Sequence, residues 1–163
     1  MNNLNKKSYL ISMNKNFIHN KFLNIAEEIA KDSKCIQLHV GAVLVKDKRI
    51  ISTGYNGTPS KFINCNEYWK NIKPQRELHH KFSELYEIHA ELNAILYAAR
   101  SGVSIEGCDI YITHQPCFNC LKMLCGAGIH NIYYRYDYDK CILNSKINNM
   151  LKKCNVKLYK IKE

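Results

Sequence analysis

The chain contains two short groups of metal-ligand residues that a fold must bring together. His89-Ala90-Glu91 is followed, 25 residues after Glu91, by Pro116-Cys117-Phe118-Asn119-Cys120. A hydrolytic zinc site needs three protein ligands and one open position for water. His89, Cys117 and Cys120 supply the three ligands, which leaves Glu91 to face the water as an acid and base. The spacing predicts a one-zinc catalytic centre. The alternative is a purely structural zinc clip, or no metal at all.

The two-residue gap between the cysteines predicts that both sulfurs lie on the first turn of a helix. Pro116 suits the start of a helix, and the helix dipole there favours thiolate over thiol. Two thiolates balance the charge of Zn2+, while one neutral imidazole keeps the metal acidic enough to lower the pKa of its water toward about 7. A helix N-terminus is therefore part of the predicted site.

Length and composition bound the domain organisation. The 163 residues suit one domain with a real core, and we expect it over residues 16–163, preceded by a polar N-terminal tail at 1–15. No run of 18 apolar residues is present, and the N-terminal segment lacks the apolar region of a signal peptide. Eight cysteines with this spacing indicate reduced thiols and metal. We expect a cytoplasmic protein, acting in the host cytoplasm if viral, without a membrane partner.

The formal net charge of +10 raises the question of a nucleic-acid partner. Of the 24 basic residues, only Arg49, Arg76, Arg100 and Arg135 are arginines, and the lysines are spread from Lys6 to Lys162. A groove that follows a nucleic-acid backbone concentrates its cations. We therefore expect nucleic-acid binding to be unlikely, and a small phosphate-bearing ligand suits the same sign of charge.

The apolar pattern predicts alternating helices and strands. We expect helices at 17–34, 89–100, 117–125 and 142–153, and strands at 40–45, 50–55, 108–113, 129–134 and 156–161. The first two strands form an antiparallel hairpin, and 108–134 has βαβ order. Residues 60–86 are an irregular connection with a short helix near its end. The predicted fold class is α/β, a three-layer α/β/α sandwich with a five-stranded mixed sheet and both ligating helices on one face.

The pattern HxE…PCxxC is the known signature of zinc-dependent nucleobase deaminases, and further segments narrow the resemblance. These are Val40 to Val43, Ile50 to Pro59, Asn64-Cys65, Glu87 to Ile95, Ala98 to Arg100 and Pro116 to Cys120. Together they resemble the deoxycytidylate (dCMP) deaminase family, especially its phage and viral forms, over roughly residues 17–160. The resemblance implies a cytidine deaminase-like fold and hydrolysis of dCMP to dUMP and ammonia by zinc-activated water, which feeds thymidylate synthesis.

The resemblance also implies substrate contacts. Asn56 would bind the deoxyribose, the Ala90 backbone and the Gln115 carbonyl would hold the edge of the base, and Tyr138 would contact the phosphate. The alternatives are that Asn56 only fills a turn position and that Tyr138 packs at an interface.

A second, structural zinc is implied at Cys35, Cys65, His79 and Glu87. Two thiolates, an imidazole and a carboxylate form a closed tetrahedral set. The alternative is four unconnected residues: a buried Cys35, a free Cys65, a surface His79 and a Glu87 that caps a helix.

The family resemblance further implies a homo-oligomer, from dimer to hexamer, activated by dCTP and inhibited by dTTP, with Mg2+ accompanying the triphosphates. The effector site would lie near Gly54, Tyr55 and Gly57. Tyr97 and Arg100 share a helix face and would pack between subunits. The alternative places Tyr97 in the core and Arg100 in solvent at a helix C-terminus.

Three other functions compete with this interpretation. A bifunctional dCMP/dCTP deaminase is the nearest rival, because one residue at the phosphate site could decide it. A tRNA or polynucleotide deaminase shares the zinc site but needs basic and aromatic loops for flanking nucleotides. A non-catalytic zinc-binding module has no use for Glu91.

Overall fold

The computed structural model describes residues 3–138 and 143–162. The elements run in the order α1 (Asn3–Ala30), β1 (Gly41–Lys46), β2 (Arg49–Tyr55), α2 (Cys65–Tyr68), α3 (Arg76–Tyr86), α4 (Ala90–Arg100), β3 (Asp109–His114), α5 (Phe118–Gly126), β4 (Asn131–Tyr136), α6 (Ser145–Lys153) and β5 (Lys157–Lys160). Within these described ranges, no helix is both long and apolar enough to cross a membrane.

The sheet has the strand order β2-β1-β3-β4-β5. Strand β1 is antiparallel to β2 and β3, whereas β3, β4 and β5 are mutually parallel. The β1–β2 hairpin turns at Asp47 and Lys48, which have φ values of 49° and 62°. Two positive φ values in a two-residue loop match the right-handed twist of the strands. The predicted five-stranded mixed sheet is confirmed.

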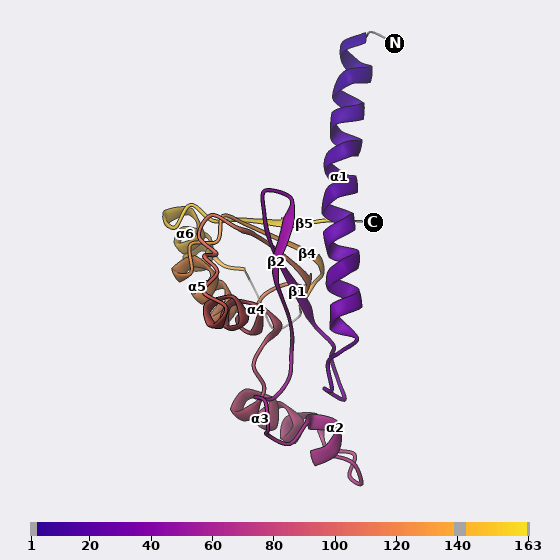
Figure 1. The fold of residues 1–163 in the computed structure, drawn as a ribbon, viewed down its shortest axis with the longest axis vertical. Coiled ribbons are helices and arrows are strands. Elements are labelled where there is room, and N and C mark those ends of the chain that lie inside the picture. Colours follow the sequence, from indigo (N-terminus) through magenta and orange to yellow (C-terminus); the bar gives the residue numbers. More distant parts are fainter. Residues whose placement is uncertain (1–2, 139–142, 163) are drawn as a thin grey trace.

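Helices cover both faces of this sheet (Figure 1). One core lies between the sheet and helices α4, α5 and α6, and includes Leu44, Ile110 and Leu121. The other lies under α1, with Leu23 and Val43 among its buried residues. Val43 and Leu44 are neighbours on β1 and enter different cores because successive strand residues point to opposite faces. The three-layer α/β/α arrangement is confirmed, with α4 and α5 on the same face.

Two glycines set how closely the helices approach the sheet. A Cβ on Gly41 would lie 1.9 Å from the carbonyl oxygen of Ala26 in α1, and one on Gly54 would lie 2.4 Å from the carbonyl oxygen of Ala90 in α4. Backbone therefore meets backbone at both crossings. Gly54 fixes the first turn of α4, which carries Glu91.

Helix α1 differs from the sequence expectation. It runs from Asn3 to Ala30 instead of 17–34, and so includes most of the segment 1–15 that was predicted as a polar tail. No Gly or Pro occurs before Gly41 to stop the helix earlier. Its first half extends beyond the sheet (Figure 1). The division of the chain into a tail and a domain at residue 16 stays a prediction.

The 60–86 connection is more regular than expected. Asn64 and Glu67 form a capping box that starts α2, and α3 then occupies Arg76–Tyr86. These helices share a small separate core, which consists of Cys35, Cys65 and Phe82 with Trp69 packed against it. Figure 1 shows α2 and α3 together beyond one end of the sheet.

Candidate functional site

The first metal-ligand group assembles where the N-termini of α4 and α5 meet. His89 is the N-cap of α4 and Cys117 is the N-cap of α5. The Nδ1 atom of His89 lies 3.3 Å from the Sγ atom of Cys120 and 3.6 Å from that of Cys117. All three ligand atoms lie within 4.8 Å of one another. One imidazole nitrogen and two sulfurs this close together are a donor set that fits a single zinc ion.

The electrostatics of this group favour negative charge on sulfur. The neighbouring Cys120 thiol, together with His89, lowers the pKa of Cys117 to about 4, while the same contact with Cys117 raises the pKa of Cys120. The contact with Cys117 in turn raises the pKa of His89. Both helix N-termini add positive partial charge beside the sulfurs. The site is therefore built to hold a thiolate, which is the form that binds metal.

Glu91 stands next to these ligands and is only 4% exposed. Burial raises the pKa of its carboxyl group, and the carboxyl is close enough to Cys120 to raise the pKa of that thiol as well. A buried carboxyl whose pKa is raised holds a proton more readily than an exposed one, which suits a group that must accept and return protons. The arrangement suits acid and base chemistry at a water or substrate beside the three ligands.

A cavity of about 390 Å³ opens over this group. Its lining includes His89, Glu91 and Cys117, as well as all four residues predicted to contact the substrate, which are Asn56, Ala90, Gln115 and Tyr138. The structure therefore gathers the predicted substrate residues around one space. Its volume lies within the range typical of small-molecule sites.

Asn56 has a structural task at this cavity. Its Oδ1 atom accepts a hydrogen bond from the backbone N–H of Val40 at 2.8 Å, and its Nδ2 atom donates to the carbonyl of Leu38 at 2.9 Å. Asn56 thereby holds the segment that supplies Leu38 and Val40 to the cavity wall. Each amide atom keeps one further hydrogen-bonding position, which could serve a ligand.

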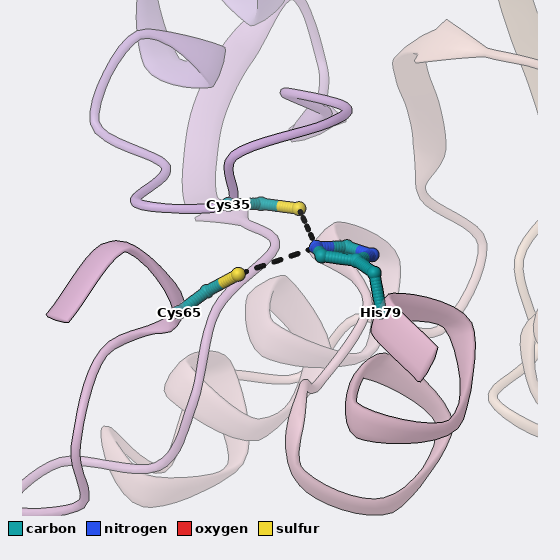
Figure 2. Close-up of side chains that lie close together, drawn as sticks. All are labelled: Cys35, Cys65 and His79. Carbon is teal, nitrogen blue, oxygen red and sulfur yellow. Dashed lines mark hydrogen bonds between the residues drawn. The ribbon is translucent and has the colours of Figure 1, made fainter. Parts of the chain in front are cut away.

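The second predicted ligand group also comes together (Figure 2). The Nε2 atom of His79 lies 3.5 Å from the Sγ atom of Cys35 and 3.3 Å from that of Cys65. All three residues are buried, at 2 to 4% exposure. The alternative of a free Cys65 and a surface His79 does not describe this packing.

Several features of this second group fit a metal ion. Burial lowers the pKa of His79, so its imidazole is neutral, as a metal ligand must be. Burial raises the pKa of both thiols, that of Cys65 to about 12. Backbone hydrogen bonds oppose this rise, from Leu38 and Gln37 to Cys35 and from Ile36 to Cys65.

Glu87, the fourth predicted ligand, is buried at the edge of this group. Ser83 donates a hydrogen bond to its Oε2 atom, while Oε1 is buried without a hydrogen-bond partner. Its carboxylate is near enough to raise the pKa of both thiols. A buried carboxylate oxygen without a partner is costly, and a cation in the Cys35–Cys65–His79 group would supply one.

Sequence reasoning missed part of the cavity wall. Helix α3 contributes Arg76, His80 and Ser83 to the lining, next to Glu87. These four polar residues recur at intervals of four, three and four, which is the spacing of one helix face. Looking for a polar stripe, instead of an apolar one, in residues 60–86 would have revealed them.

The residues predicted to serve regulation and assembly come from two elements: Gly54 and Tyr55 end strand β2, with Gly57 just after it, and Tyr97 and Arg100 lie in α4. Gly54 is buried against α4, Tyr55 is 40% exposed, and Gly57 pairs with Ile88 through two backbone hydrogen bonds. Tyr97 is 62% exposed, so it does not pack in the core of the chain. Arg100 is exposed in the last turn of α4.

Comparison with known proteins gives a consistent picture. The family model described as the cytidine and deoxycytidylate deaminase zinc-binding region matches residues 17–136. The deoxycytidylate deaminases of Enterobacteria phages T2 and T4 are each 40% identical to this chain, over 72% of it and over 79% and 77% of the phage proteins. The crystal structure of dCMP deaminase from cyanophage S-TIM5 in complex with dCMP and dUMP has a TM-score of 0.66 at 30% identity, and covers 98% of both chains.

Proposed function

The chain belongs to the cytidine and deoxycytidylate deaminase family, and is a deaminase; we propose that it hydrolyses dCMP to dUMP and ammonia with a bound zinc ion. The observation that carries this proposal is the buried Glu91 carboxyl beside His89, Cys117 and Cys120 at the cavity. A structural zinc clip has no need of a buried carboxylate that faces a cavity.

Zinc held by His89, Cys117 and Cys120 would supply a Lewis acid that makes water nucleophilic at neutral pH. Glu91 acts as the general base and the general acid of the reaction. Its carboxylate accepts a proton from the attacking water and delivers it to N3 of the cytosine, then takes the remaining proton from the new hydroxyl on C4 and passes it to the amino group, which leaves as ammonia. Its burial, which raises its pKa, supports both the accepting and the donating steps.

Substrate orientation follows from the cavity wall. We assign the backbone of Ala90 and the carbonyl of Gln115 to the edge of the base, Asn56 to the deoxyribose and Tyr138 to the phosphate. Their common position around the cavity supports this assignment.

The second ligand group is assigned to a structural zinc held by Cys35, Cys65, His79 and Glu87. The convergence of the two sulfurs on one imidazole and the partnerless Oε1 of Glu87 support it. This zinc would tie α2 and α3 to the segment that follows α1, because the ligands come from all three regions.

Assembly and regulation are assigned from the family resemblance. A dimer or hexamer would use the exposed face of α4 with Tyr97 and Arg100, and dCTP and dTTP, with Mg2+, would act near Tyr55 and Gly57. The exposure of Tyr97 supports an interface there. A Tyr97→Glu variant that remains as large as the wild type in light scattering would rule this interface out. The product would feed thymidylate synthesis in the cytoplasm.

A substrate panel tests the proposed reaction. Ammonia release is measured side by side with dCMP, dCTP, cytidine and single-stranded DNA. The proposal predicts the highest kcat/KM for dCMP. Comparable turnover of dCTP would establish the bifunctional enzyme instead, and preferential turnover of DNA would establish a polynucleotide deaminase.

A further inference from the structure

Helix α3 faces both ligand groups. His79 reaches the second group, where its Nε2 atom lies between the sulfurs of Cys35 and Cys65 (Figure 2). Its neighbour His80 lines the cavity that Glu91 and Cys117 also line. Adjacent helical residues point about 100° apart. One helix therefore joins the buried cluster to the wall of the substrate cavity.

The cavity face of α3 carries cationic and hydrogen-bonding groups. Arg76 is exposed at the first turn of α3, and among the described residues nothing forms an ion pair or hydrogen bond with its guanidinium. His80 lies one turn further along the same face, 3.7 Å from the carboxylate of exposed Glu84. Three acidic residues of the described chain line the cavity. Glu87 and Glu91 are buried, and Asp137 is paired with Lys160. Within residues 3–138 and 143–162, Arg76 is thus a cation at the cavity that no side chain pairs with.

Helix α3 depends on the small cluster for its position. No residue of α3 belongs to either of the two main cores, as far as the structure describes them, and its buried residues His79 and Phe82 pack in the small core with Cys35, Cys65 and Trp69. Around Phe82, the rings of Tyr68, Trp69 and Tyr86 form one aromatic group that joins α2 to α3. This aromatic group holds α3 to α2, and the contacts of His79 with Cys35 and Cys65 are what join α3 to the segment that follows α1.

We propose that α3 is an anion-recognition arm, in which Arg76 and His80 hold the 5′-phosphate of the nucleotide, and that the Cys35–Cys65–His79 cluster positions this arm. The inference rests on the proposed function and deepens it. Metal at the second group then governs nucleotide binding, while the chemistry at Glu91 proceeds on any substrate that is bound. Arg76 and His80 are binding residues, and Cys35, Cys65 and His79 are positioning residues.

Product binding tests the arm directly. Calorimetry with dUMP measures the dissociation constant for wild type, Arg76→Ala, His80→Ala and Lys81→Ala, with deoxyuridine as the probe that lacks the phosphate. Lys81 is the matched control, because it is on the same helix, pairs with Glu77 at 3.1 Å and is not part of the cavity wall. Loss of one charge-assisted phosphate contact predicts about tenfold weaker dUMP binding in Arg76→Ala, unchanged deoxyuridine binding, and a Lys81→Ala variant within about twofold of wild type. Unchanged dUMP affinity in Arg76→Ala would overturn the arm.

The cluster is tested by Cys65→Ser, with zinc content and hydrogen exchange measured beside dUMP affinity. The proposal predicts one zinc fewer per chain, faster hydrogen exchange confined to residues 76–86, and unchanged protection of residues 90–100. The variant should bind dUMP as weakly as Arg76→Ala does. In dCMP turnover, KM should rise while kcat stays the same. Cys65→Asp, which keeps an anionic ligand, should restore part of each effect and serves as the test if Cys65→Ser does not fold. Zinc loss with unchanged dUMP affinity would refute the positioning role. So would zinc loss in which hydrogen exchange speeds up in α4 as much as in α3.

The deamination of dCMP and the binding of its phosphate by α3 can be disproved independently. A wild-type enzyme that releases no ammonia from dCMP would remove the proposed function. A wild-type enzyme that turns dCMP over but shows the same dUMP affinity in every α3 variant would leave the function standing and remove the arm.

Discussion

The Nδ1 atom of His89 and the Sγ atom of Cys120 lie 3.3 Å apart although 31 residues separate them. The contact arises because α4 and α5 pack side by side on one face of the sheet with their N-termini together. Each ligand is at an N-cap or in a first turn, where the backbone N–H groups are free to stabilise negative charge. The relative position of the N-termini of α4 and α5 thus sets the geometry of the site.

Gly54 controls the placement of α4. A methyl group there would lie 2.4 Å from backbone atoms of Ala90 and Ala94, so Gly54→Ala should push α4 from the sheet and cost about 1–3 kcal/mol of stability. Activity should fall further than stability, because Ala90 adjoins His89 and Glu91. Gly126→Ala is the control, since its Cβ would meet nothing within 4 Å. Denaturant unfolding and ammonia release measure both effects, and equal behaviour of the two variants would contradict this packing.

Glu27 and Arg135 fix α1 to β4. Their side chains pair at 2.8 Å, with Arg135 only 5% exposed, and Arg135 also donates to Asn20 and Asn24. Glu27→Ala leaves that guanidinium buried without its carboxylate and should cost about 3–5 kcal/mol. Glu77→Ala, which breaks an exposed pair with Lys81, should cost less than about 1 kcal/mol. Chemical denaturation of both variants checks the contrast, and a Glu27→Ala variant as stable as Glu77→Ala would disprove it.

Zinc affinity at the second group should rise steeply with pH. Burial raises the pKa of Cys35 and brings that of Cys65 to about 12, so both thiols carry protons in the metal-free protein at pH 6–8 and must release them when they bind zinc. Two released protons correspond to an affinity that falls by about 100-fold for each unit that the pH decreases. Competition with a chelator at pH 6, 7 and 8 measures the slope. An affinity independent of pH would exclude thiolate ligation there.

Cys120 and Cys154 provide a matched pair of cysteine variants. Cys120 is a buried member of the first ligand group, whereas Cys154 is exposed at the end of α6. Cys120→Ser should lose one zinc per chain and lose turnover of dCMP, while Cys154→Ser should keep both. Metal analysis and ammonia release on the two proteins decide this, and a Cys120→Ser enzyme with wild-type zinc content would contradict the assignment of the ligand.

The sequence predicted that His89, Cys117 and Cys120 would come together, because the spacing that indicates this is local. His89 and Glu91 share one turn, Cys117 and Cys120 share another, and such spacings determine which side chains can meet once two helices are adjacent. The strands could be predicted equally well, because β-branched runs such as 40–45 lie between clear turn residues. The antiparallel hairpin and the βαβ unit predicted a mixed sheet, whereas the strand order β2-β1-β3-β4-β5 is known only from the structure.

Other features depend on contacts that no local pattern contains. The start of α1 was missed because a polar segment without apolar period does not indicate a helix. Helix α3 was expected only as a short helix, and the role of Arg76 and His80 at the cavity was not seen, because its position depends on Cys35 and Cys65, which are distant in sequence. The pairing of Glu27 with Arg135 likewise exists only after α1 has packed on β4.

Turnover of dCMP by the Glu91→Gln variant, with its zinc content measured on the same sample, tests the central claim most directly. The substitution keeps the size of a buried side chain and removes its capacity to carry protons, so zinc should remain at the wild-type level. The kcat should fall by about 10²–10⁴-fold, the contribution typical of a positioned acid and base. A zinc-loaded Glu91→Gln enzyme that converts dCMP to dUMP at near wild-type rate would contradict the account.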